Sequence, residues 1–151
     1  MYLIEISTKR KHKVFVDVID GEYFKYLIKS KFYFDWGKEK ECDIFKLVLG
    51  EEILGLMACC THKRDERIEI KLLSVSKENR GKNKKYERIA GTLIGFACRE
   101  AIKLFEINGC VSLVPKTRLK QHYIEQYGMI DAGRHVFLEG DQLLKMLKKY
   151  E

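Results

Sequence analysis

The sequence has few residues that interrupt regular structure, and it has no long apolar run. Pro115 is the only proline and glycine supplies 11 of 151 residues, so regular elements with tight connections are expected. Because no stretch rich in proline, glycine or serine divides the chain, a single domain over residues 1–151 is expected. No apolar stretch approaches the roughly 20 residues that a membrane-spanning helix needs.

Metal-binding and secretory patterns are also missing. The five cysteines show no Cys-x-x-Cys spacing, so no metal site is expected. Their odd number and scattered positions predict reduced, buried thiols, and the adjacent Cys59 and Cys60 should point to opposite faces of a strand. Residues 1–13 lack the apolar stretch and cleavage site of a signal peptide. A cytoplasmic protein without a membrane partner is therefore expected.

Positive charge is what the sequence has in excess. The formal net charge is +7, from 29 Lys and Arg against 22 Asp and Glu, which favours anionic partners. The cations are concentrated in three runs, at residues 9–13, 77–88 and 145–149. Only the middle run lies beside a predicted helix start.

The hydrophobic pattern predicts both strands and helices. Alternation and short apolar runs predict strands over residues 1–7, 13–18, 44–49, 53–60, 67–75, 110–114 and 129–138. Spacings of three and four predict helices over 87–104, 116–127 and 141–150, with one or two short helices within 23–36. Strand, helix and strand in succession from 67 to 114 predict a parallel pair with a right-handed crossover. The expected class is α+β, an antiparallel meander that leads into one parallel crossover, with helices on both faces.

The cationic segment Asn79–Arg88 leads into a helix that opens with Ile89-Ala90-Gly91-Thr92. The first N–H groups of a helix have no partner within it, and the helix dipole adds partial positive charge there. A helix start beside Lys and Arg side chains therefore predicts a site for a phosphorylated ligand. A solvated charge run without a ligand is the alternative.

The order of elements and several motifs resemble the GNAT-type N-acetyltransferases, over about residues 44–138. Members of that superfamily have a strand that ends in apolar-apolar-x-Val, and the matching residues here are Leu72-Leu73-Ser74-Val75. A phosphate loop, Gln/Arg-x-x-Gly-x-Gly/Ala, then leads into a long helix, and the segment Ile89–Ile94 is similar to its exit. The segment Tyr123–Met129 resembles the family's final motif, Tyr-x-x-x-Gly-Phe.

Two positions depart from the family pattern. The loop motif, placed back from Ala90, gives Lys85-x-x-Arg88-x-Ala90, with Arg88 where the family has a glycine that lets the backbone approach the pyrophosphate. An arginine there either binds phosphate through its side chain or blocks the site. Alternatively, Arg80-Gly81-Lys82 begins the loop and the segment up to Tyr86 is an insertion. Tyr123 lies one residue earlier, relative to Gly128, than the family's catalytic tyrosine.

The resemblance implies transfer of an acetyl group from acetyl-CoA, the co-substrate, to an amine by direct attack in a ternary complex. Glu69 occupies the place of the general base of the histone-acetyltransferase branch and should share a strand face with Lys71 and Leu73. Tyr123 is the candidate acid, with Tyr127 as a weaker one. The alternatives are an exposed or salt-bridged Glu69 and a Tyr123 that only packs on the core.

The same resemblance gives the expected cofactor contacts, at the end of the strand, in the loop and at the helix start. They are Leu73, Ser74, Val75, Arg80, Gly81, Lys82, Lys85, Tyr86, Arg88, Ile89, Ala90 and Gly91. The backbone N–H of Ser74 or Val75 is the expected oxyanion donor. The acceptor stays open among a small-molecule amine, a protein amino terminus, a lysine and a charged transfer RNA.

A second hypothesis is a catalytically eroded module with the same fold. It would bind CoA as a sensor, or bind nucleic acid through the basic surface and the aromatic stretch 23–36. A core aromatic cluster is the alternative for that stretch.

Overall fold

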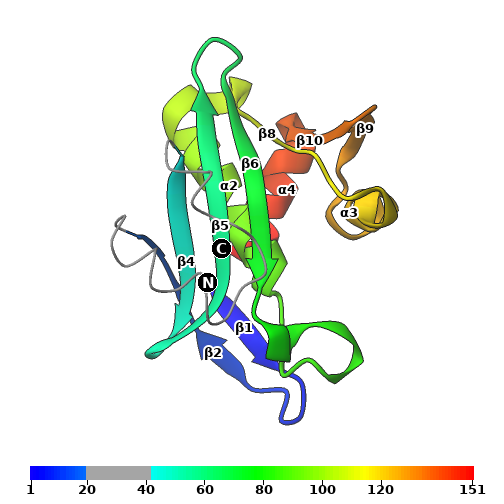
Figure 1. Ribbon diagram of the computed structural model, residues 1–151. Coiled ribbons are helices and arrows are strands. Elements are labelled where there is room, and N and C mark those ends of the chain that lie inside the picture. Colours follow the sequence, from blue (N-terminus) through cyan, green and yellow to red (C-terminus); the bar gives the residue numbers. More distant parts are fainter. Residues whose placement is uncertain (20–41) are drawn as a thin grey trace.

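Two β-sheets and the helices packed on them make up the computed structural model, which describes residues 1–19 and 42–151. The larger sheet has seven strands in the order β3-β4-β5-β6-β8-β10-β9, and only the β6–β8 pair is parallel (Figure 1). The strands are β3 (Phe15–Val18), β4 (Asp43–Leu49), β5 (Glu52–His62), β6 (Arg67–Val75), β8 (Cys110–Leu113), β9 (Ile130–Ala132) and β10 (His135–Glu139). The expected α+β class with one parallel crossover is confirmed.

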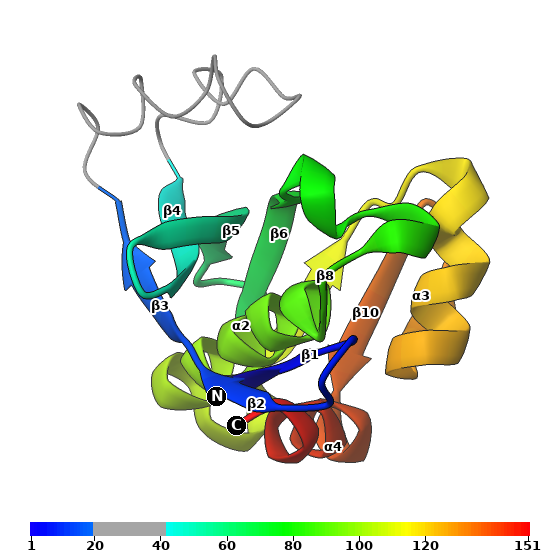
Figure 2. The same cartoon turned by 90° about the horizontal axis from the view of Figure 1, so that it is seen from below.

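The described helices lie on both sides of this sheet. They are α2 (Ile89–Phe105), α3 (Lys120–Tyr127) and α4 (Gly140–Tyr150). Helix α2 is the crossover between β6 and β8, and α4 packs beside it on the same face (Figure 2). Helix α3 lies on the other side of β10 and ends at Gly128, whose left-handed φ of 68° allows its N–H to donate to Ile124.

Two glycines allow α2 to approach its neighbours closely. A Cβ at Gly55 of β5 would lie 2.9 Å from Leu93 Cδ1 and 3.0 Å from Ile89 Cγ2, so α2 packs directly on this strand. A Cβ at Gly91 would overlap the ring of Tyr150, which brings the end of α4 against the start of α2. The start of α2 is therefore fixed from two sides.

The smaller sheet joins the beginning of the chain to the segment just before α2. It contains β1 (Tyr2–Glu5), β2 (Lys11–Lys13) and β7 (Tyr86–Glu87), in the order β2-β1-β7. The predicted strand over 13–18 is confirmed for 15–18, which form β3, but Lys13 belongs to β2. Strand β2 pairs with β1, whereas β3 pairs with β4 in the larger sheet. The alternating pattern continues through the buried Val14 and does not reveal this change of partner.

The predicted strand over 129–138 is also divided in two. Gly133 turns the chain with a φ of 84°, and its N–H donates to the Asp131 carboxylate at 2.9 Å, so β9 and β10 form a hairpin. The helix predicted over 116–127 begins with a 3-10 turn at Thr117–Leu119 before α3. The helices expected within 23–36 lie outside the described residues.

Both faces of the larger sheet bury apolar side chains. On the α2 face, the core includes Ile68, Ile70, Met57 and Leu93, all at most 3% exposed. On the opposite face, a smaller cluster contains Ile19, Ile44, Ile53, Leu56 and Ala58. No helix in residues 1–19 and 42–151 is long and apolar enough to cross a membrane.

The expectation of five reduced thiols is wrong for two of them. Cys42 and Cys60 form a disulfide with a Cα–Cα distance of 4.8 Å, within the usual range for such bonds. Cys59 and Cys60 do point to opposite faces, since Cys59 belongs to the α2-side core. Burial raises the pKa of the Cys98 thiol to about 12 and raises that of Cys59 still further.

This arrangement predicts a fixed pattern of alkylation. In denaturant without reductant, iodoacetamide should label Cys59, Cys98 and Cys110, and it should label all five cysteines after reduction. In the native protein, Cys59 and Cys98 should react slowly because they are buried and the thiolate is the nucleophile. Intact mass spectrometry counts the labels, and five labels without reductant would contradict the disulfide.

Candidate active site

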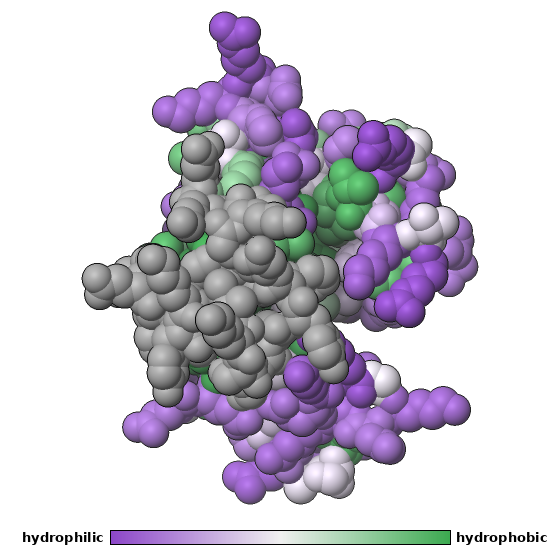
Figure 3. Space-filling view, in the orientation of Figure 1, coloured by the Kyte–Doolittle hydropathy of each residue, from purple (hydrophilic) through white to green (hydrophobic). Residues whose placement is uncertain are grey.

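Strands β6 and β8 separate at the centre of the larger sheet. Their parallel pairing runs from Arg67 and Cys110 to Ile70 and Leu113 and ends there. Strand β6 continues to Val75, paired only with β5 among the described strands. One edge of the segment 71–75 therefore has backbone groups without a β-strand partner within 1–19 and 42–151. Figure 3 shows an indentation between the part of the molecule that carries α3 and the part that carries the segment after β6.

A β-bulge lies at the point of separation. Ala58 pairs with Leu72 but Cys59 pairs with Ile70, so Lys71 is the extra residue on β6. The bulge shifts the side-chain alternation by one residue: Leu72 joins the cluster on the face opposite α2, and Leu73 packs on the α2 side. The expectation that Glu69 shares a face with Leu73 is therefore wrong, because the simple period of two does not cross a bulge.

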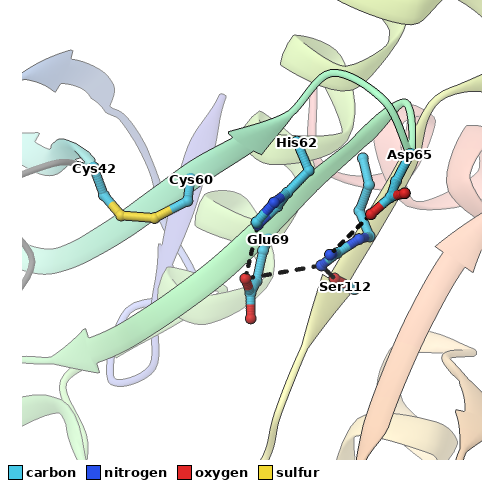
Figure 4. Close-up of polar contacts among 7 residues, drawn as sticks. Cys42, Cys60, His62, Asp65, Glu69 and Ser112 are labelled. Atoms are coloured by element: carbon cyan, nitrogen blue, oxygen red, sulfur yellow. Dashed lines mark hydrogen bonds and ion pairs between the residues drawn. A yellow bond between two sulfur atoms is a disulfide. The ribbon is translucent and has the colours of Figure 1, made fainter.

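Glu69 is one residue before the last β6–β8 pair, on the face opposite α2. Its neighbours Ile68 and Ile70 point into the α2-side core, and its own carboxylate is 12% exposed. Glu69 Oε1 lies 2.9 Å from Nε2 of His62 on β5 and 3.8 Å from Nη1 of Arg67 (Figure 4). Arg67 in turn donates to Ser112 Oγ of β8 at 2.8 Å.

These contacts connect β5, β6 and β8 across the face of the sheet. The Glu69 carboxylate is thus held in one place by an imidazole and a guanidinium. Of the two alternatives for Glu69, the ion-paired arrangement is the one observed, and it places a carboxylate–imidazole pair at the separation of the strands. The Cys42–Cys60 disulfide lies on the same strand as His62 (Figure 4).

The end of β6 is capped by an arginine from the following loop. Arg80 Nε donates to the carbonyl of Val75 at 2.6 Å, and its Nη2 donates to Ser74 Oγ at 3.1 Å. The buried Asn79 closes the loop, because its Oδ1 accepts the N–H of Tyr86 at 2.9 Å. A Cβ at Gly55 would also lie 3.4 Å from the Ser74 carbonyl, so the end of β6 and the start of α2 meet at this glycine.

The residue before α2 has a left-handed backbone, a conformation that glycine adopts most readily. Arg88 is left-handed, with φ 84° and ψ 9°, and no side chain caps the helix after it. Its guanidinium turns away from the loop and lies 4.1 Å from the ring centroid of Tyr2 and 4.6 Å from that of Tyr150. It also donates to the carbonyls of Tyr2 (3.3 Å) and Lys149 (2.7 Å).

The Arg88 side chain therefore joins β1, at Tyr2, and the end of α4, at Lys149, to α2. Lys11 Nζ lies 4.6 Å from the Tyr2 ring, and Lys149 Nζ lies 5.4 Å from the Tyr150 ring. We refer to the series Lys11–Tyr2–Arg88–Tyr150–Lys149 as the cation–aromatic ladder. Arg88 can contribute its backbone to the helix start, while its side chain is engaged elsewhere.

The remaining expected cofactor residues divide into two groups. Gly81, Lys82 and Lys85 are exposed, and Gly81 adopts a φ of 70°. Tyr86, Ile89 and Gly91 are buried, so they offer a ligand only backbone groups. Ala90 is half-buried between them.

The two candidate acids lie on α3, within a tyrosine cluster. Tyr123 is partly buried against the core, and burial raises the pKa of its hydroxyl. Tyr127 lies 5.9 Å from Tyr123 and 6.4 Å from Tyr150, measured between ring centroids. Burial, with Tyr150 and Tyr123 nearby, also raises the pKa of Tyr127. Both hydroxyls therefore stay protonated near neutral pH.

A pocket of about 210 Å³ lies elsewhere, between Met1, Lys13, Phe15, Arg99 and the end of α4. Neither Glu69 nor Ser74 lines it.

Comparison with known proteins identifies the fold. No protein-family model and no curated protein sequence matches the chain. Solved structures do match it. An acetyltransferase from Bacillus subtilis in complex with CoA is 14% identical, with a TM-score of 0.58 over 84% of this chain and 99% of that one. The chain has the fold of the GNAT-type N-acetyltransferases.

Two further GNAT-fold structures are similar to this chain. Arabidopsis thaliana Naa50, in complex with the bisubstrate analogue CoA-Ac-MVNAL, is 14% identical, with a TM-score of 0.55 over 82% of this chain and 95% of that one. The AtaT–AtaR complex bound to DNA contains a chain that is 10% identical, with a TM-score of 0.63 over 91% of this chain and 99% of that one.

The sequence alone did not identify three polar residues near the expected site. His62 is seven residues from Glu69 but faces it across the β5–β6 hairpin. Asn79 appeared only as the first residue of a loop, yet it is buried and closes that loop. Thr92, one residue beyond the expected cofactor contacts, has a buried hydroxyl without a hydrogen-bond partner among the described residues.

The left-handed conformation of Arg88 can be tested by a matched pair of substitutions. Arg88→Ala and Arg88→Gly both remove the guanidinium from the ladder, so both should lower the free energy of unfolding. Only alanine keeps the Cβ that disfavours positive φ, so Arg88→Ala should be less stable than Arg88→Gly by about 1 kcal/mol. Urea denaturation measures the difference, and equal stabilities would contradict the assigned backbone conformation.

Proposed function

We propose that this protein transfers an acetyl group from acetyl-CoA to an amine acceptor by direct attack in a ternary complex. The observation that carries the proposal is the separation of β6 from β8 beside the uncapped start of α2. It leaves strand edge and helix amides available to one extended ligand. The GNAT fold and the CoA-bound neighbour support the choice of that ligand.

The diphosphate of the cofactor would bind to the backbone N–H groups at the start of α2. These amides are favourable for anions because of the helix dipole, and the nearby Lys82 and Lys85 add positive charge. Arg88 replaces the family's glycine without blocking the site, because its side chain is directed into the ladder. The pantetheine arm would then lie along the edge of Leu73, Ser74 and Val75 that has no strand partner among the described residues, where a backbone N–H would stabilise the oxyanion.

Deprotonation of the acceptor is the step that the Glu69–His62 pair would perform. An imidazole is the commonest general base in proteins, and a carboxylate bonded to one ring nitrogen leaves the other nitrogen oriented toward the acceptor. When the His62 proton is on Nε2, this N–H donates a hydrogen bond to Glu69 Oε1 at 2.9 Å. The Nδ1 atom then remains as the base. We assign base catalysis to the pair, with Glu69 orienting the imidazole.

Tyr123 would return a proton to the departing thiolate. The raised pKa of Tyr123 keeps its hydroxyl protonated, so that it can donate a proton. In Figure 1, β8 lies between α3 and β6, the strand that carries Glu69. A thiolate with a pKa near ~8.5 is a tolerable leaving group unaided, so this acid contributes less than the base. In the balanced reaction, the ammonium first gives one proton to the base, and the resulting amine forms the C–N bond. The C–S bond then breaks as tyrosine gives a proton to sulfur, and the second nitrogen proton returns to the tyrosine through solvent.

Cofactor binding is the first test. Isothermal titration calorimetry with acetyl-CoA should give a saturable heat. The triple variant Lys82→Gln/Lys84→Gln/Lys85→Gln should weaken the affinity at least 10-fold, since hydrogen bonds to charged groups contribute about 1.5–3 kcal/mol each. Lys63→Gln/Arg64→Gln, at the exposed β5–β6 turn, is the control and should leave the affinity within about 2-fold. No heat and no thermal shift at millimolar acetyl-CoA would reject the proposed function.

The base pair is tested by steady-state kinetics at neutral pH with an amine acceptor. His62→Gln and Glu69→Gln should each lower kcat by roughly 10²–10⁴-fold and leave acetyl-CoA affinity nearly unchanged. The double variant should be no slower than the slower single variant, because the residues act as a unit. The matched control is His12→Gln, which breaks a 2.9 Å pair with Glu5 on the smaller sheet and should not change kcat. A kcat unaffected by His62→Gln would remove the imidazole from the mechanism.

A further inference from the structure

The three basic runs of the sequence form one surface in the folded protein. Strand β7 pairs with β1, and Ile6 N donates to the Lys85 carbonyl, so the run at 77–88 lies beside the β1–β2 hairpin that carries the run at 9–13. The ladder brings Lys149 of the third run to the same place. Lys13 and the end of α4 also line a common pocket. Segments about 60 residues apart are thus neighbours.

This surface has little negative charge of its own. The only carboxylates within the three runs are Glu78 and Glu87, and the exposed Glu151 lies just after the third run. Glu5, at the end of β1, is engaged by His12 at 2.9 Å and by Thr8 at 3.1 Å, and these hydrogen bonds, with Lys85 nearby, lower its pKa. Most of the surrounding cations are exposed: Lys9, Arg10, Lys11, Lys13, Lys82, Lys84, Lys85, Lys145, Lys148 and Lys149. In Figure 3, residues at the end of the molecule that carries β1 and β2 are mostly hydrophilic.

Two properties show which kind of anion fits such a surface. The cations lie on both sides of the ladder and on three elements, which is more than one diphosphate at the start of α2 can contact. No large hydrophobic side chain is exposed within the three runs, and only Phe15 and Leu144 are exposed directly beside them. A membrane-binding surface instead places several apolar side chains among its cations. Because Tyr2 and Tyr150 already contact cations in the ladder, contacts to phosphate are favoured over stacking with bases.

We propose that the β1–β2 hairpin, the 77–88 segment and the end of α4 together bind the phosphodiester backbone of a nucleic acid, without base specificity. Phosphate contacts position a nucleic acid and carry no sequence information. Binding at this surface does not require acetyl transfer, so its test is independent of the proposed function.

The test is fluorescence anisotropy with a labelled single-stranded RNA of mixed sequence, over about 50 to 200 mM salt. Each phosphate contact contributes about −0.7 to the slope of log affinity against log salt for a single strand. Arg10→Gln/Lys11→Gln/Lys13→Gln should therefore flatten the slope by about 2, and Lys145→Gln/Lys148→Gln/Lys149→Gln by a similar amount. The control, Lys63→Gln/Arg64→Gln/Arg134→Gln, has the same net charge at distant hairpin turns and should keep the wild-type slope.

Four outcomes would overturn the proposal. Equal slopes in all three variants would show that net charge alone attracts the RNA, and an effect of only one run would show that the surface is not shared. Loss of RNA binding at saturating acetyl-CoA would place the RNA at the start of α2. Equal or tighter binding to phosphatidylserine vesicles or to polyglutamate would assign the surface to a membrane or to acidic protein.

Duplex RNA and single-stranded DNA, run in parallel, identify the nucleic acid that binds best. Thermal denaturation confirms that every variant is folded.

Discussion

The conformation of a single residue, Arg88, determines how the start of α2 is placed. A left-handed backbone costs a residue with a Cβ about 1–2 kcal/mol. Two hydrogen bonds from the guanidinium and two aromatic contacts offset this cost, since a charged hydrogen bond contributes about 1.5–3 kcal/mol and a cation–π contact about 0.5–2. The same contacts attach β1 and α4 to the helix. A glycine would reach the conformation freely but would not connect these elements.

How far the sequence predicts the structure depends on the range of the interactions. The run from β4 to β8 is predictable because its strands and helix follow each other closely and have clear hydrophobic periods. The change of partner between β2 and β3 is not predictable, because residues 13–18 form one apolar-rich run without a turn residue and the difference arises from β1 and β4. The Cys42–Cys60 bond is hidden for the same reason: only the pairing of β4 with β5 brings the two residues together.

The same limit on prediction from sequence applies to individual residues of the candidate site. Glu69 is recognisable from its place in a motif, and it lies one residue before the last β6–β8 pair. His62 is not recognisable, since its contact with Glu69 depends on the register of a hairpin that contains a bulge. The bulge also decides which side chains accompany Glu69, so a count of alternating residues gives the wrong neighbours. Arg88 was identified as a departure from the family, but only the structure shows where its side chain lies.

The ladder gives a physical reason for the proposed cofactor site and the proposed nucleic-acid surface to adjoin one another. Its central cation is the residue that precedes the helix amides, and its outer cations belong to the basic runs on either side. A diphosphate at the start of α2 and a phosphodiester chain on the hairpin would share the field of the 77–88 segment. Each anion would then lower the positive potential available to the other, unless their contacts are separate.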